Sequence, residues 1–179
     1  MRFLPLGILS LLLVGCAVTL HGTVSTASYA EPPRQPLFTV VTPNSLSLTE
    51  RNITGLIEKK MEECGYKKAA SREVANVAVL YNYSIGPGRT SISSSPDFVW
   101  GGQQVESTTT YPRFFQLIIV DLEKSKIPEK IEIIWQGEIY SSGSSSNITS
   151  LAAYFIDVLF ENYGSTVTNK NFFKVVGFS

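Results

Sequence analysis

A cysteine near the start of the chain is the residue with the clearest chemical potential. Cys16 follows an apolar run and closes the tetrapeptide Leu13-Val14-Gly15-Cys16. This order, a hydrophobic residue, then a small residue just before the cut, then a cysteine, resembles a bacterial lipobox, where the thiol is alkylated with diacylglycerol and the preceding peptide is removed. The pattern predicts that the mature chain begins at a lipidated Cys16.

The residues before this cysteine have the layout of an export signal. Arg2 and the N-terminal amine give a short positive region, and Phe3–Val14 is mostly apolar. Proline, glycine and serine interrupt the apolar run, so a permanent membrane-spanning helix of about 20 apolar residues is the weaker interpretation. We expect residues 1–15 to be a lipoprotein signal peptide.

A second cleavage site leaves an alternative open. Ser28-Tyr29-Ala30 has small residues where an ordinary signal peptidase reads them, and cleavage there would release a soluble periplasmic or secreted protein starting at Glu31. Ala17 favours the outer membrane for the lipidated form, because many Gram-negative bacteria use an aspartate at this position to retain a lipoprotein in the inner membrane. We therefore expect a lipid anchor in the outer membrane and a domain that faces the periplasm.

Composition argues against several classes of function. Removing 15 of the 179 residues, Arg2 among them, leaves 164 residues with a net charge of −1, which is no electrostatic footprint for nucleic acid. His21 is the only histidine and lies beside the leader, so a Cys/His zinc site or a Ser-His-Asp triad lacks its parts. We expect no metal, no cofactor and no enzymatic activity. Cys64, the other cysteine, is expected to be a small buried residue.

Hydrophobic periodicity predicts one α+β domain over residues 37–164. Ser47 with Glu50 resembles a capping box before an amphipathic helix, and Asn147 can cap a second helix. Because successive strands have short links, we expect an antiparallel sheet with both helices packed on one face, a two-layer sandwich. Strands are predicted over Leu37–Val41, Val77–Ile85, Phe114–Leu122 and Ile131–Tyr140.

Three further segments are predicted to lie outside this pattern. Residues 16–36 are rich in small residues and proline and are expected to form a flexible tether. Arg89–Tyr111 is dense in serine and threonine, and forms either a hairpin or a long mobile loop. Residues 165–179 are a C-terminal apolar tail, which either adds a strand to the sheet or docks on another protein by strand addition.

Several short motifs recur in one known family. They are Gly65-Tyr66 followed by Ala75-Asn76 and a strand, an apolar strand ending in Asp121 followed by Trp135-Gln136-Gly137, and the amphipathic helix Leu151–Tyr163. Together they resemble, over about residues 37–164, a family of small bacterial envelope lipoproteins known as domain of unknown function four-one-three-six. Asn76 departs from the family's usual acid. The resemblance implies a periplasm-facing α+β lipoprotein and no known activity.

Acidic residues surround the predicted hairpin of the two strongest strands. Asp121, Glu123, Glu132 and Glu138 would need to converge in a cleft to act as a general acid and base, and no nucleophile or metal partner accompanies them. We interpret them as charges on a solvated face. Trp135 is expected in the core.

Four aromatic residues outside the regular pattern are candidate partner contacts. Phe98, Trp100, Phe172 and Phe173 either anchor a partner or fold back onto the sheet. The function we predict is a structural or interaction module that contacts the membrane and other envelope proteins, as an accessory subunit of an envelope or secretion complex. The alternative is a periplasmic binding module for an apolar ligand, lipid or glycan.

Overall fold

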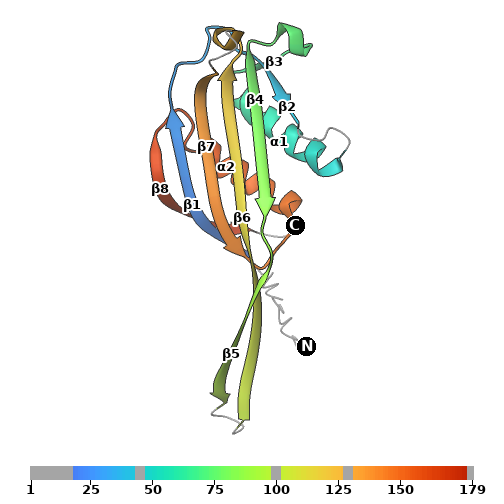
Figure 1. The fold of residues 1–179 in the computed structure, drawn as a ribbon, viewed down its shortest axis with the longest axis vertical. Coiled ribbons are helices and arrows are strands. Elements are labelled where there is room, and N and C mark those ends of the chain that lie inside the picture. Colours follow the sequence, from blue (N-terminus) through green and yellow to red (C-terminus); the bar gives the residue numbers. More distant parts are fainter. Residues whose placement is uncertain (1–17, 43–46, 98–101, 127–130, 177–179) are drawn as a thin grey trace, which may run out of the picture.

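The computed structural model describes residues 18–42, 47–97, 102–126 and 131–176. Seven strands form a sheet in the order β3-β2-β4-β6-β7-β1-β8, and an eighth strand, β5, pairs with β6 beyond the end of this sheet (Figure 1). The strands are β1 (Val18–Ser28), β2 (Leu37–Val41), β3 (Lys67–Lys68), β4 (Val77–Ile85), β5 (Arg89–Asp97), β6 (Gly102–Asp121), β7 (Glu132–Gly143) and β8 (Val167–Val176). The helices are α1 (Leu48–Glu63) and α2 (Ile148–Phe160), with short 3-10 turns at Arg72–Val74 and Lys124–Lys126.

The sheet is mixed, so the prediction of a purely antiparallel sheet is wrong. β2 pairs in parallel with both β3 and β4, while all other pairings are antiparallel. The physical reason is the connection between β2 and β4. That connection contains α1, and a helical crossover returns the chain to the same edge, so the next strand runs in the same direction. The α+β class is confirmed.

Both helices lie on one face of the sheet (Figure 1) and begin at their predicted caps. The Ser47 hydroxyl accepts from the amide of Glu50 at 3.5 Å. The Asn147 side chain accepts from the amide of Thr149 at 3.0 Å. Gly65, with φ +88°, follows α1 in the left-handed conformation that ends many helices. Among the described residues no helix is long and apolar enough to cross a membrane.

A group of aromatic residues joins the helices to the sheet. We call it the aromatic cluster; its members are Phe38, Tyr66, Trp135, Phe160 and Tyr163. Trp135 of β7 is 1% exposed, and its ring centroid lies 5.4 Å from that of Tyr163 and 6.3 Å from that of Phe160. Tyr66, which follows α1, meets Tyr163 hydroxyl to hydroxyl at 2.5 Å. Phe38 of β2 packs edge-on against Tyr66 at 6.4 Å. The expectation that Trp135 is in the core is confirmed.

The predicted tether is wrong over its first half, because Val18–Ser28 forms β1. This strand pairs with β7 on one side and with β8 on the other, and its Leu20 and Val24 are buried. The segment reads as a tether because other positions facing the helices are small. At Gly22 a Cβ atom would come within 2.2 Å of the Tyr140 carbonyl oxygen.

The predicted C-terminal tail is a strand of the sheet over Val167–Val176, and it pairs antiparallel with β1. Phe172 lies opposite Gly22 and fills the space that the missing side chain leaves, with ring atoms 3.0 and 3.1 Å from the position of a Cβ. β1 and β8 are therefore complementary, and each strand looks irregular when its sequence is considered alone.

We predict that Trp135→Ala lowers the free energy of unfolding by about 3–5 kcal/mol, because a buried indole leaves a large cavity among the aromatic cluster. The measurement is denaturant unfolding of the purified domain. Tyr140→Ala is the control on the same strand, since Tyr140 is 54% exposed and should cost no more than about 1 kcal/mol. Equal losses for the two variants would contradict this assignment of the strand's faces.

Candidate interaction surface

The candidate residues from the sequence divide into two groups. Cys16, Phe98 and Trp100 lie outside the residues that the structure describes. The two phenylalanines of β8 are described, and they point to opposite faces of the sheet. Phe172 faces the helices and packs against the core. Phe173 is 68% exposed on the face that the helices leave uncovered, which we call the open face.

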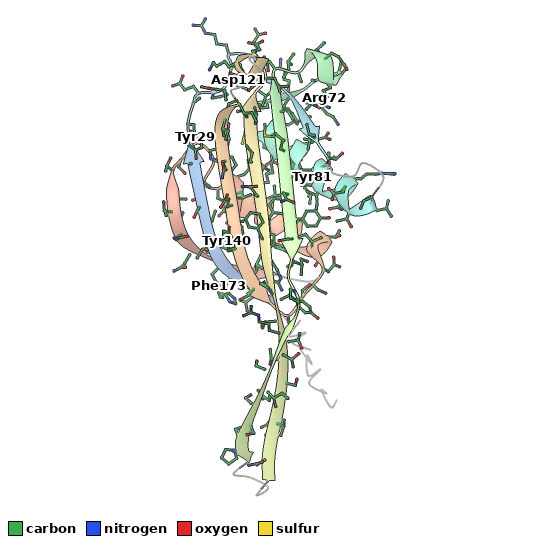
Figure 2. All side chains as sticks on the ribbon, viewed as in Figure 1. Tyr29, Arg72, Tyr81, Asp121, Tyr140 and Phe173 are labelled. Carbon is green, nitrogen blue, oxygen red and sulfur yellow. The ribbon has the colours of Figure 1, made fainter. Side chains whose placement is uncertain are left out.

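The open face carries exposed apolar side chains near one end of the sheet. Phe114 of β6 and Tyr140 of β7 have ring centroids 5.0 Å apart. Phe173 and Val175 of β8 are 68% and 61% exposed on the same face, across β1 from the two rings. Figure 2 shows Tyr140 and Phe173 toward the end from which the β5–β6 ribbon projects. Sequence reasoning did not identify Phe114 and Tyr140, since both belong to strands that alternate regularly.

The segment that the sequence left as hairpin or loop is a hairpin of β5 and β6. It has nine residue pairs, from Arg89 opposite Thr110 to Asp97 opposite Gly102. It projects from the sheet as a two-stranded ribbon (Figure 1). Isolated two-stranded ribbons are marginally stable in water. The length of this hairpin beyond the sheet is therefore not explained by folding of the domain alone.

The two faces of this hairpin differ in charge. Side chains alternate along each strand, and directly paired residues share a face. Arg89 and Glu106 fall on the same face, which we call the charged face. Ile92, 72% exposed, and Val105, 62% exposed, fall on the other, which we call the uncharged face. The described side chains of the uncharged face are those of Thr90, Ile92, Ser94, Pro96, Gln103, Val105, Ser107 and Thr109.

The motif residues that carry the family resemblance have structural contacts. The Asp121 carboxylate is 3% exposed and accepts the backbone amides of Glu123 and Lys124, each at 3.0 Å, so it closes the turn after β6. A Cβ at Gly137 would lie 2.5 Å from the Trp135 ring, so the glycine makes room for the tryptophan. Each of these residues therefore has a role in stabilising the fold.

Asn76, which departs from the family's acid, also has a structural role. Its side-chain oxygen accepts the amide of Leu37 at 2.8 Å, and its amino group donates to the carbonyl of Gln35 at 3.1 Å. A carboxylate could accept the first hydrogen bond but could not donate the second. The Asn76 amide therefore links Gln35 and Leu37, at the start of β2, to the start of β4.

A buried polar cluster lies between α1 and β4. The Glu50 carboxylate, in a residue 6% exposed, accepts hydrogen bonds from the hydroxyls of Tyr81 and Tyr83, the second at 3.0 Å. Thr54 also contacts the Tyr81 hydroxyl at 3.2 Å. Burial, and then the hydrogen bond to Glu50, raise the pKa of Tyr81. The arrangement fastens the first turn of α1 to the sheet.

Two expectations about ionisable residues need correction. Asp121 is buried, although we interpreted it as a solvated charge. Backbone amides donate the hydrogen bonds to its carboxylate that water would give an exposed one. Cys64 is exposed at the C-cap of α1, one position past the last helical residue, although we expected it to be buried. Burial of part of the side chain, and then the charge of Glu63, raise the pKa of the Cys64 thiol, which disfavours the reactive thiolate. Glu138 lies on the open face and accepts from Gln116 at 2.8 Å.

The cavities among the described residues are open and partly charged. One of about 410 Å³ is lined by residues of α1 and α2 that include Lys60, Glu63 and Asp157. Another, of about 200 Å³, lies between β1, β7 and the start of β8. Within the described ranges no group of three or more histidine, cysteine, aspartate or glutamate side chains could hold a metal ion.

Comparison with known proteins finds similarity in structure. No family model and no curated protein matches the sequence. A PDZ domain protein from Parabacteroides distasonis superposes with a TM-score of 0.56 at 13% identity, over 89% of this chain, which spans only 39% of that protein. This match shows a shared fold.

Two other solved structures are similar over most of their own length. A DUF4136 family protein from Bacteroides thetaiotaomicron has 18% identity and a TM-score of 0.48, over 78% of this chain and 94% of that one. A PelC dodecamer from Paraburkholderia phytofirmans has 14% identity and a TM-score of 0.44, over 77% and 93%. The first of these two proteins belongs to the family that the sequence motifs resemble.

The two neighbouring phenylalanines of β8 provide a matched pair of variants. We predict that Phe172→Ala lowers the free energy of unfolding by about 2–3 kcal/mol, because it empties the space above Gly22. Phe173→Ala should change it by no more than about 0.5 kcal/mol. Thermal and denaturant unfolding of both variants measures the difference, and the reverse order would show that β8 has the opposite face inward.

The buried tyrosines make stability depend on pH. Burial raises the pKa of Tyr66 and of Tyr81, so both hydroxyls stay protonated in the folded protein, while tyrosines of the unfolded chain ionise at about pH 10. We predict that the free energy of unfolding is unaffected by these groups below that pH and falls above it, because the unfolded state then binds fewer protons. Tyr81→Phe should make the fall shallower. Identical slopes in the two proteins would contradict the assignment.

Proposed function

We propose that this chain is a non-enzymatic cell-envelope lipoprotein, anchored in the outer membrane through Cys16 and facing the periplasm. Its domain acts as an interaction module, an accessory subunit of an envelope or secretion complex. The observation that carries the proposal is the open face, where Tyr140, Phe173 and Val175 expose more than half of their surface. Exposed apolar groups that gather on one face favour contact with another protein.

The position of β1 supports processing at Cys16 over cleavage after Ala30. Cleavage after Ala30 would remove all of β1, which lies between β7 and β8. The buried side chains of Leu20 and Val24 would leave the core, and β8 would lose its only partner strand in the described sheet. Processing at Cys16 leaves every residue of β1 in the mature chain.

A binding module for an apolar ligand, lipid or glycan remains the second candidate. Such sites are concave and mainly apolar, with a volume of about 300–1,000 Å³. A cavity of about 410 Å³ beside α1 and α2 includes Lys60, Glu63, Asp157 and Glu161 in its lining, which is a poor match to an apolar ligand. The exposed side chains of the open face suit a protein partner better.

The lipid anchor is tested by Cys16→Ser. We predict that the native chain partitions with membranes and that mass spectrometry finds a diacylglyceryl thioether on Cys16. The variant should move to the soluble periplasmic fraction or accumulate uncut, because it has no thiol to alkylate. Cys64→Ser is the matched control and should keep the lipid. An unmodified mature chain that begins at Glu31 would overturn the lipoprotein assignment.

The open face is tested by co-purification. We predict that Tyr140→Ser with Phe173→Ser reduces the yield of co-purifying envelope proteins at least about fivefold, since a lost contact of about 1.4 kcal/mol is worth tenfold in binding. Leu48→Ser is the control, because Leu48 is 78% exposed at the start of α1, away from this face. An unchanged yield from the double variant would remove the open face as the contact site.

A further inference from the structure

The start of β1 and the base of the β5–β6 hairpin lie at the same end of the sheet (Figure 1). The strand register places Gly22 of β1, Ser141 of β7 and Arg113 of β6 side by side. Val18 is four residues beyond Gly22 toward this end, and Thr110 of the hairpin is three residues beyond Arg113. The first residue of β1 is therefore level with the base of the hairpin.

A lipid on Cys16 would hold this end of the molecule at the membrane. Cys16 precedes Val18 by two residues, which span at most about 7 Å even when fully extended. The hairpin continues past this level for nine residue pairs, about 30 Å at the usual rise of a strand. A hairpin of that length, which starts beside the proposed anchor and points away from the helices, would come within reach of the lipid surface.

The backbone of the hairpin decides how it meets that surface. Beyond the sheet, each of its strands has one edge with no partner strand among the described residues. Backbone groups without hydrogen-bond partners are strongly disfavoured in hydrocarbon, so a single ribbon cannot cross the bilayer. The hairpin can lie along the interface, where water and headgroups satisfy its edges.

The distribution of charge selects the face. Arg89 and Glu106 share the charged face, while Ile92 and Val105 are exposed together on the uncharged face. On the uncharged face the hydroxyls of Thr90 and Thr109 form a hydrogen bond of 2.9 Å, which lowers the free energy needed to remove them from water. The exposed apolar side chains and the charged side chains therefore stand on opposite faces of the described hairpin, and the remaining side chains of the uncharged face are neutral, which suits contact with a membrane interface.

We propose that the uncharged face of the β5–β6 hairpin lies on the bilayer that holds the lipid of Cys16, as a second membrane contact. This inference rests on the proposed lipid anchor. The partner is the lipid surface itself. The hairpin fixes the tilt of the domain, because two separated contacts constrain its orientation where one anchor leaves it free to rotate.

The test is photocrosslinking of the full chain in cells. Four variants each carry one p-benzoylphenylalanine. It replaces Ile92 or Val105 on the uncharged face, and Ser93 or Glu106 on the charged face in the two control variants. The whole population of the protein is isolated in mild detergent, and mass spectrometry detects both lipid adducts at the probe and the presence or absence of the diacylglyceryl group on Cys16. We expect lipid adducts at 92 and 105 to exceed those at 93 and 106 at least fivefold.

The outcomes separate the hairpin from the anchor. Equal adducts at the four positions in a chain that carries the Cys16 lipid overturn the hairpin contact alone. Crosslinks from 92 and 105 mainly to protein, a second copy included, overturn it as well. An unmodified Cys16 with the expected adduct pattern overturns the anchor and keeps the hairpin contact. An unmodified Cys16 without that pattern overturns both.

Discussion

The contact between Trp135 and the end of α2 is the interaction on which the other elements depend. The indole fills the space over Gly137, which has no room for a Cβ, and packs against Phe160 and Tyr163. Tyr163 in turn contacts Tyr66 at the end of α1. One buried ring on the sheet thus fixes the ends of both helices, and large buried aromatics dominate core energetics for this reason.

That arrangement gives the sheet two different faces. The helices occupy one face, where the aromatic cluster and the buried carboxylate of Glu50 hold them. The other face carries Phe114, Tyr140 and Phe173 without a covering layer among the described residues. The residues that define the family resemblance belong to the first face and to turns, so they explain the fold. The surface available for interaction is formed by residues outside those motifs.

The proposed functions meet at one end of the molecule. β1 begins there, the hairpin leaves the sheet there, and the exposed rings of the open face lie toward the same end (Figure 2). An anchored domain of this shape would hold the end of the sheet that carries these rings close to the membrane surface. A partner that binds the open face would then also sit near the membrane, which suits an accessory subunit of an envelope complex.

Local sequence patterns determined the helices with their caps, the alternation of β4 and β7, and the burial of Trp135, because each depends on neighbours within a few residues. Only the tertiary structure decided the roles of β1 and β8. Gly22 lacks a side chain, and Phe172, 150 residues later, supplies the packing that a strand needs at that position. Neither segment shows the complementarity alone. The parallel pairing of β2 also follows from the path of α1 across the sheet, which no local pattern encodes.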